Sequence, residues 1–362
     1  MDGPRRALSC AELAGAARAP LLDDRGRIVD PLLVVDLDTP VADGPVRSDR
    51  VLVGITTADR LDAGHRNLAA ALDLTFGPAT LAGSGRMFAA TDDPETTATG
   101  LCEAAEANPQ ATLVLAQVLR TAGNLSGPAA LDAESLAYST LLGGAEFKAW
   151  LARRGPRALP PAAADPVLVA RTGNVLHLTL NRPERRNAFG RQLRDALVDA
   201  LRIAELDDTV ERILLDGAGP SFCAGGDLAE FGTAPDLATA HFVRTRAGAA
   251  LPLHRLAGRV EARVHGSCVG AGIELPAFAG RVIAHPAATF RLPEIGMGLL
   301  PGAGGTVSIP RRIGRWRTLL LALTGEPLDA ATALAWGLVD ELDPQAGVQV
   351  KTGYQTPNGS AL

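Results

Sequence analysis

Short apolar runs alternate with longer amphipathic segments along the second half of the chain. Four runs rich in Val, Leu and Ile have the length and composition of strands. They are residues 175–180, 211–216, 260–264 and 281–284. Between them, residues 192–206 and 237–256 repeat apolar positions at helical spacing. Repeated alternation of strand and helix predicts an α/β fold rather than a sandwich or a helical bundle.

A similar but weaker alternation precedes this half. The expected strands are residues 32–35, 51–55 and 111–115. The expected helices are residues 65–74, 94–107 and 131–150. This pattern predicts a smaller α/β unit at the N-terminus.

A proline-rich segment separates the two patterns. Residues 153–166 contain four prolines together with small and charged residues, as linkers do. We therefore expect an N-terminal α/β region (1–153), a linker (154–166) and a second domain (167–342). The polar tail, residues 343–362, is expected to lack regular structure.

Composition narrows the class of protein. The chain has 362 residues, of which 47% are hydrophobic and 21% charged, so it can bury a large core. A net charge of −5 argues against a broad nucleic-acid-binding surface. Four cysteines without metal-type spacing favour reduced thiols and no metal site. The chain has no continuous apolar signal or membrane-spanning segment, so we expect a cytoplasmic enzyme with no membrane partner.

Two glutamates in apolar surroundings are the strongest candidates for chemistry. Glu274 lies just inside an apolar helix opened by glycines, and Glu294 is expected to close a short strand over residues 290–294. Burial raises a carboxyl pKa toward the range in which it acts as a general acid or base. The alternative is a pair of solvated surface acids.

Two glycine-containing loops offer backbone N–H groups. Residues 223–226 and 270–272 allow a close approach of the backbone, and two converging N–H groups make an oxyanion hole. The alternative is that these glycines only permit tight turns. The glycines of residues 301–306 do not have the spacing of a dinucleotide-binding or P-loop motif, and we expect a turn into a helix over 307–313.

Three further side chains are weaker candidates for a catalytic or metal-binding role. Cys223 has no recognisable His and Asp or Asn partners for a nucleophilic role. His265 precedes a glycine at a strand end and is expected to be a hydrogen-bonded turn residue. Asp227 is a candidate metal ligand, but a turn or helix-capping role is favoured.

Taken together, residues 167–342 resemble the enoyl-CoA hydratase/isomerase (crotonase) superfamily. The resemblance is carried by Asn181-Arg-Pro-Glu-Arg-Arg-Asn-Ala188, Ser221-Phe-Cys-Ala-Gly-Gly-Asp227, Val264-His-Gly with Gly270-Ala-Gly-Ile-Glu274, and Leu292-Pro-Glu-Ile-Gly with Pro301-Gly-Ala-Gly-Gly-Thr306. It implies a crotonase-like spiral of repeated ββα units that binds an acyl-CoA thioester. It also implies a homo-oligomer, a trimer or hexamer, and no cofactor other than the coenzyme A of the substrate.

The resemblance also assigns roles to residues. The oxyanion hole falls on the backbone N–H groups of Cys223 and Ala271. Glu274 is implied to activate water for attack at C3, and Glu294 to exchange the proton at C2. Segments near coenzyme A correspond to Arg185, which is expected to reach its phosphates, and to Asn187, Ala188, Ala224, Gly225, Gly226, Asp227 and Gly270.

The sequence departs from the family pattern at both ends. Family members continue into a C-terminal helical region, which is truncated here, whereas residues 131–150 loosely resemble the family's C-terminal helix. We expect the N-terminal region to be a degenerate crotonase-like unit that supplies this helix; an unrelated α/β module is the alternative. The expected activity is enoyl-CoA hydration. The alternatives are an acyl-CoA isomerase or hydrolase, a cofactor-independent aryl-acetyl-CoA dioxygenase, and a non-catalytic acyl-CoA-binding protein.

Overall fold

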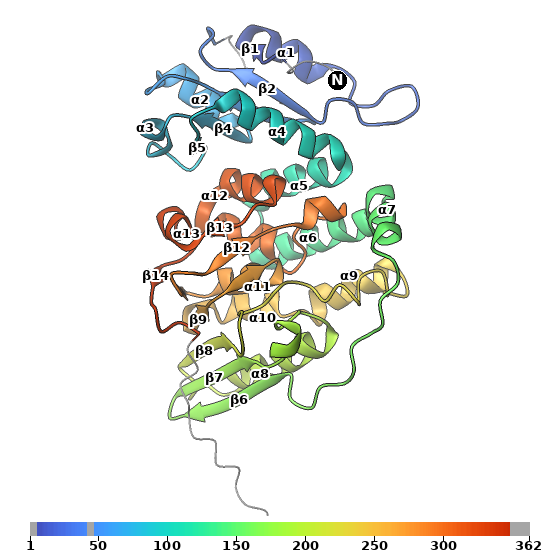
Figure 1. The fold of residues 1–362 in the computed structure, drawn as a ribbon, viewed down its shortest axis with the longest axis vertical. Coiled ribbons are helices and arrows are strands. Elements are labelled where there is room, and N and C mark those ends of the chain that lie inside the picture. The colour runs from blue at the N-terminus through green and yellow to red at the C-terminus, as the bar shows by residue number, and fades with distance from the viewer. Residues whose placement is uncertain (1–5, 42–46, 348–362) are drawn as a thin grey trace, which may run out of the picture.

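The computed structural model describes residues 6–41 and 47–347, and stacks its elements along one long axis (Figure 1). The N-terminal region forms a five-stranded sheet at one end, and a six-stranded sheet lies toward the other end. Helices and a three-stranded sheet lie between them. The predicted α/β class is confirmed. Most of the predicted polar tail, residues 348–362, lies outside the described residues.

The N-terminal sheet is parallel throughout and has the order β1-β2-β3-β4-β5. Its strands are β1 (Leu8–Ser9), β2 (Leu32–Asp36), β3 (Val51–Ile55), β4 (Leu74–Gly77) and β5 (Phe88–Ala90). The helices beside it are α1 (Cys10–Arg18), α2 (Ala63–Ala71), α3 (Ala79–Ala82) and α4 (Pro94–Ala107). Every residue of β3 is buried, as expected for a strand covered on both faces. The predicted strands at 32–35 and 51–55 are confirmed.

The strand predicted at residues 111–115 is wrong. These residues lie in the helix α5 (Pro109–Ala122), which begins with a proline at its first turn. A proline is favoured there because its missing N–H has no intrahelical acceptor. Of its seven buried residues, those at 111, 112, 115, 116 and 119 follow the spacing of one helix face. A five-residue apolar run fits a strand or a buried helix face equally well. The spacing of the buried positions over the whole of α5 identifies it as a helix.

The helical segment predicted at 131–150 consists of two helices, α6 (Gly127–Leu142) and α7 (Ala145–Arg154). Gly143 and Gly144 separate them. Helix α6 packs against α9 (Leu237–Arg246) and α12 (Gly305–Thr324), which belong to the second half of the chain. After α7, residues 155–166 run along one side of the molecule without regular structure (Figure 1).

The six-stranded sheet has the order β14-β11-β9-β8-β7-β6. Its strands are β6 (Val167–Thr172), β7 (Val175–Leu180), β8 (Arg212–Gly217), β9 (Val260–Val264), β11 (Arg281–Ala284) and β14 (Glu341–Leu342). Only the pair β6–β7 is antiparallel. Adjacent parallel strands end at the same edge of a sheet, so the loops that follow β8 and β9 leave it side by side.

Helices connect these strands. Helix α8 (Arg191–Leu206) buries Leu193, Leu197 and Leu201 along one face, which matches the prediction at 192–206. The single helix predicted over 237–256 is instead α9 followed by α10 (Ala250–Arg255). Gly248 lies between them, where a side chain would meet the backbone oxygen of Arg244 at 2.0 Å. The chain therefore breaks the helix at a position that only glycine can occupy.

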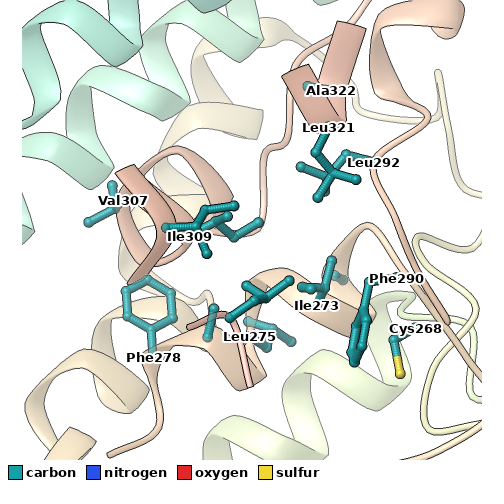
Figure 2. Packing of buried hydrophobic residues seen from close by; sticks show 14 of the residues in the cluster. Cys268, Ile273, Leu275, Phe278, Phe290, Leu292, Val307, Ile309, Leu321 and Ala322 are labelled. Atoms are coloured by element: carbon teal, nitrogen blue, oxygen red, sulfur yellow. The ribbon is translucent and has the colours of Figure 1, made fainter. Parts of the chain in front are cut away.

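A small sheet and the longest helix support the candidate site. The sheet contains β10 (Ser267–Val269), β12 (Thr289–Arg291) and β13 (Leu328–Asp329), and α13 (Ala330–Trp336) follows it. Figure 2 shows the apolar core here, where Ile273 and Leu275 lie near Ile309 of α12. The helix predicted at 307–313 extends in fact from Gly305 to Thr324, with a kink at Gly314, whose φ is 83°.

The N-terminal sheet is joined to α12 by polar contacts. The buried carboxylate of Asp73 pairs with Arg120 at 2.5 Å and with Arg315 of α12 at 3.0 Å. The indole N–H of Trp316 donates to the carbonyl oxygen of Leu72 at 3.0 Å. The two halves of the chain therefore share a buried interface.

Candidate active site

A cavity of about 440 Å³ opens where α6 and α7 meet the second half of the chain. Its wall is largely apolar and includes Leu131, Tyr138 and Phe147 from α6 and α7, and Phe189 and Phe231 from the second half of the chain. Apolar cavities of this size with a few convergent polar groups are typical of ligand sites. Several residues of the segment 131–150, which is expected to supply the missing helix, line the same cavity as Glu294. Their descent from a degenerate crotonase-like unit stays a prediction.

Gly270 brings the two predicted carboxylates together. Its backbone has φ 50° and ψ −119°, a conformation that side chains disfavour. A Cβ atom at Gly270 would lie 2.5 Å from Oε1 of Glu294 and 3.7 Å from Oε1 of Glu274. Both carboxylates therefore pack against the space that glycine leaves open.

Glu274 ends the short helix α11 (Ala271–Glu274) and is buried. Its Oε2 accepts hydrogen bonds from the backbone N–H groups of Ala303 at 2.7 Å and Gly305 at 2.9 Å. Burial raises the pKa of Glu274 well above its usual range, and the charges of Glu294 and Glu134 raise it further. The two N–H donors oppose this shift and hold one carboxylate oxygen in a fixed place.

Glu294 is also buried, but it does not close a strand as predicted. Strand β12 ends at Arg291, and Glu294 opens the 3-10 helix η4 (Glu294–Met297). The intervening Pro293 has no N–H to donate to a strand ladder, which explains the early end. Among the described residues, Oε2 of Glu294 has no hydrogen-bond partner. Burial, followed by the charge of Glu134, raises the pKa of Glu294 to about 7.

The two loops predicted to form an oxyanion hole lie side by side. Cys223 pairs with Cys268 in a parallel bridge, and a Cβ atom at Gly272 would lie 2.1 Å from the carbonyl oxygen of Cys223. The N–H of Ala271 belongs to the first turn of α11, where a backbone donor has no intrahelical acceptor. Ala271 lines the cavity. The shared role of Cys223 and Ala271 stays a prediction.

The residues expected near coenzyme A occupy two loops that pair with each other. The N–H of Phe189 donates to the carbonyl oxygen of Gly225 at 2.7 Å, and that of Ala224 donates to Arg186 at 2.9 Å. Arg185 forms an ion pair with the buried Asp227 at 2.7 Å. Five of the residues predicted for the whole site line the cavity: Gly226, Asp227, Ala271, Glu274 and Glu294. The other seven do not line the cavity and lie in the neighbouring loops: Arg185, Asn187, Ala188, Cys223, Ala224, Gly225 and Gly270.

The side chain of Asn187 forms all its hydrogen bonds within the protein. It is completely buried, and its side-chain oxygen accepts from the N–H of Arg182 at 2.7 Å. Its amide nitrogen donates to the carbonyl oxygens of Ala218, Ser221 and Phe222. These bonds tie the loop 182–187 to the loop after β8 and leave its side chain no polar group for a ligand.

Sequence reasoning missed two acidic residues of the cavity wall, the half-buried Glu230 and the buried Glu134 of α6. Glu134 is buried and accepts from the N–H of Gly304 at 2.8 Å, the N–H of Thr306 at 2.9 Å and the Thr306 hydroxyl at 2.7 Å. A signal existed in the sequence. Glu134 interrupts the helical stripe of residues 131, 138 and 141, where an acid is unexpected unless it has buried partners.

Cys223, His265 and Asp227 have the surroundings of structural residues. Burial raises the pKa of the Cys223 thiol to about 12, which disfavours a thiolate nucleophile at neutral pH. The ring Nε2 of His265 lies 2.9 Å from the carbonyl oxygen of Gly219, so the predicted turn role is confirmed. Asp227 accepts from the N–H of Ala229 at 3.0 Å, as a turn residue does.

The structure describes residues 6–41 and 47–347. Within those ranges, His, Cys, Asp and Glu side chains form no group arranged to hold a metal ion. Across the same ranges, the helices include none with the length and apolar character needed to cross a membrane.

Comparison with known proteins gives consistent matches to the second half of the chain. The sequence profile for enoyl-CoA hydratase/isomerase matches residues 170–354. The chain is 40% identical over 170 residues to the 1,2-epoxyphenylacetyl-CoA isomerase of Escherichia coli (strain K12), covering 46% of this chain and 64% of that protein. It is 36% identical over 178 residues to the 2,3-dehydroadipyl-CoA hydratase of the same strain, covering 49% of this chain and 69% of that protein.

Among solved structures, an enoyl-CoA hydratase of Mycobacterium smegmatis matches 50% of this chain with 33% identity and a TM-score of 0.46. The match covers 71% of that protein. The chain thus spans less than two thirds of the E. coli isomerase and about seven tenths of the other two relatives.

Proposed function

Because the chain belongs to the enoyl-CoA hydratase/isomerase family, we propose that it adds water to the double bond of a 2-enoyl-CoA thioester. One observation carries this proposal. Glu274 and Glu294 are both buried, and both direct Oε1 to the space beside Gly270. Two carboxyl groups at one place can remove a proton from water and deliver a proton to carbon.

In the proposed reaction, Glu274 acts as the general base in its carboxylate form, which the N–H donors of Ala303 and Gly305 favour against the burial that raises its pKa. Its Oε2 is held by two N–H donors, which leaves Oε1 to accept a proton from water. The water oxygen forms a bond to C3 of the enoyl group, and the electron pair of the double bond moves toward the thioester oxygen. The product of this step is an enolate.

Glu294 then acts as the general acid. Burial raises its pKa to about 7, so a substantial fraction of Glu294 carries a proton at neutral pH. That proton goes to C2 of the enolate, which gives a 3-hydroxyacyl-CoA. Exchange with solvent then returns the proton held by Glu274 and reprotonates Glu294.

The backbone N–H groups of Cys223 and Ala271 are proposed to hold the thioester oxygen. Negative charge accumulates on this oxygen in the enolate, and an oriented N–H donor stabilises it by about 3–4 kcal/mol. The contact between Gly272 and the carbonyl oxygen of Cys223 keeps the two loops in register.

The cavity wall suggests how an acyl-CoA is oriented. Tyr138, Phe147 and Phe231 offer an apolar, aromatic surface to the acyl group. Lys148, Arg191 and Arg194 lie on the same wall and offer positive charge to the phosphates of coenzyme A. Both parts of the chain therefore contribute to the proposed substrate site.

The test is a hydration assay that follows the loss of the conjugated-thioester absorbance. We expect Glu274→Gln and Glu294→Gln each to lower kcat by a factor of about 10²–10⁴, the usual contribution of a positioned acid or base. Glu326→Gln is the matched control, because Glu326 is exposed and lies outside the cavity wall. Circular dichroism checks that each variant is folded.

Product analysis separates hydration from the alternatives. Full activity in both glutamine variants contradicts the proposed roles. Migration of the double bond without water addition identifies an isomerase, and release of free coenzyme A identifies a hydrolase. Oxygen consumption with an aryl-acetyl-CoA identifies a dioxygenase, and binding without turnover identifies a non-catalytic protein.

A further inference from the structure

Four consecutive backbone N–H groups at the start of α12 are shared between two glutamates. Those of Ala303 and Gly305 donate to Glu274, and those of Gly304 and Thr306 donate to Glu134. Glu274 comes from α11 in the second half of the chain, whereas Glu134 comes from α6 in the N-terminal region. The same turn thus holds one proposed catalytic carboxylate and one carboxylate from the N-terminal region.

This arrangement follows from the chemistry of a helix N-terminus. The first N–H groups of a helix lack intrahelical acceptors and carry partial positive charge, so they favour carboxylates. Here the turn bends at Gly304, whose φ is 101°, and successive N–H groups point to alternate sides. Removing the partner on one side would leave buried donors unsatisfied, which destabilises the turn.

We propose that Glu134 is a positioning residue for Glu274, acting through the turn 303–306 that both carboxylates share. The inference rests on the proposed function of Glu274 as the general base. With Glu134 in place, the turn is anchored on one side, and its other two N–H groups hold Oε2 of Glu274. The N-terminal region therefore completes the catalytic geometry in addition to lining the pocket.

Glu134 also sets the charge of the site. Burial raises the pKa of Glu134 to about 7, while the hydrogen bonds from Thr306 and Gly304 and the charge of Arg244 lower it. Its negative charge in turn raises the pKa values of Glu274 and Glu294. The titratable and charged groups around these carboxylates are Tyr138 of α6, Arg244 of α9, Cys223, Arg291 of β12 and the three glutamates themselves.

The decisive variant is Glu134→Gln, measured across pH with a 2-enoyl-CoA. A glutamine offers only one acceptor oxygen to the three donors of Gly304 and Thr306, so the turn loosens. We expect kcat to fall about 10²-fold, the effect of a misplacement near 1 Å, with a smaller change in KM. Loss of the negative charge lowers the pKa values of Glu274 and Glu294, so both limbs of the pH profile of kcat/KM move to lower pH by about one unit.

A milder pair of variants covers the case in which Glu134→Gln does not fold. Thr306→Val removes only the hydroxyl that donates to Glu134, and it is expected to move the pH profile in the same direction by less. Thr306→Ser keeps a hydroxyl and should restore the wild-type profile. Asp132→Asn is the matched control on α6, because Asp132 pairs with the exposed Arg246 and lies outside the cavity wall.

The outcomes separate the inference from the proposed function. If the wild type hydrates no enoyl-CoA, the proposed function fails. Infrared titration of the buried carboxyl groups then tests whether Glu134 raises the pKa values of Glu274 and Glu294. A lower titration midpoint of these two groups in Glu134→Gln supports this effect, and an unchanged midpoint overturns it. In an active enzyme, the inference is overturned if folded Glu134→Gln and Thr306→Val retain the wild-type kcat and pH profile, or if Asp132→Asn moves the profile as far as Glu134→Gln.

Discussion

At the scale of single residues, Gly270 is the position on which both proposed catalytic carboxylates depend. A Cβ atom there would lie 2.5 Å from Oε1 of Glu294, and the backbone φ of 50° already disfavours a side chain. We expect Gly270→Ala to displace Glu294, abolish most activity and lower the free energy of unfolding by about 1–3 kcal/mol. Urea unfolding and kcat measure the two effects.

Gly100→Ala is the control for this prediction. Gly100 lies inside α4, and a Cβ atom there would meet no described atom within 4 Å. The change should raise the free energy of unfolding by about 0.5–1 kcal/mol, because alanine favours a helix. A Gly270→Ala protein with wild-type stability and kcat would show that the carboxylates do not depend on this space.

The sequence identified two of the three buried glutamates that line the cavity. Glu274 and Glu294 could be predicted because each stands in a glycine-containing motif that requires a special backbone. Glu134 stands in an ordinary amphipathic helix, and its partners are backbone N–H groups of a distant turn. Side-chain type and local spacing do not reveal such partners, so its role required the tertiary structure.

At the scale of elements, the contact between α6 and α9 depends on Arg244. Its guanidinium donates to Ser135 Oγ at 3.0 Å, to the Ser135 carbonyl at 3.1 Å and to Ser139 Oγ, and lies 4.6 Å from the centre of the Tyr138 ring. Lysine lacks the planar fork that makes these contacts together. We expect Arg244→Lys to lower the free energy of unfolding by about 1.5–3 kcal/mol, measured by urea unfolding.

Arg246→Lys on the same helix is the matched control for Arg244→Lys. Arg246 forms an exposed pair with Asp132, which contributes about 0–1 kcal/mol. Equal losses of stability in the two variants would contradict the role given to Arg244.

The elements differ in how far the sequence predicts them. The strands at 175–180, 260–264 and 281–284 are confirmed residue for residue, because their apolar runs lie between clear turn signals. The strand at 111–115 was wrong because a short apolar run carries no period of its own. The length of α12 was underestimated because proline and glycine usually end a helix. Here the helix continues through Pro310 and Gly314, stabilised by tertiary packing.

At the scale of the whole molecule, the candidate site needs both halves of the chain. Glu134 and Gly304 are 170 positions apart, and α6 reaches α12 only because the N-terminal region docks beside it. The sequence pattern predicted two α/β units, and the family resemblance led us to expect that residues 131–150 join the second one, but neither predicted the buried polar contacts between them. Such contacts depend on complementary shape and charge, which do not produce a periodic pattern in the sequence.

Asp73 tests whether the two halves behave as one unit. Its buried carboxylate pairs with Arg120 and Arg315 and also accepts from the N–H of Leu52 at 2.9 Å. Asp73→Asn leaves two partly buried cations without their counter-charge, so we expect a loss of about 3–5 kcal/mol in the free energy of unfolding. Tryptophan fluorescence and the proposed activity should then fall together at lower urea, because Trp316 lies at this interface and the candidate site needs both halves of the chain.

The exposed Asp24 supplies the control, and Asp24→Asn should stay within about 0.5 kcal/mol of the wild type. An Asp73→Asn protein that loses activity in a separate, earlier transition would show that the N-terminal region unfolds independently. A single shifted transition would show instead that the region that carries Glu134 is held in place by the same cooperative structure as Glu274 and Glu294. In that case the stability of the interface at Asp73 directly limits the range of conditions in which the three acids stay together.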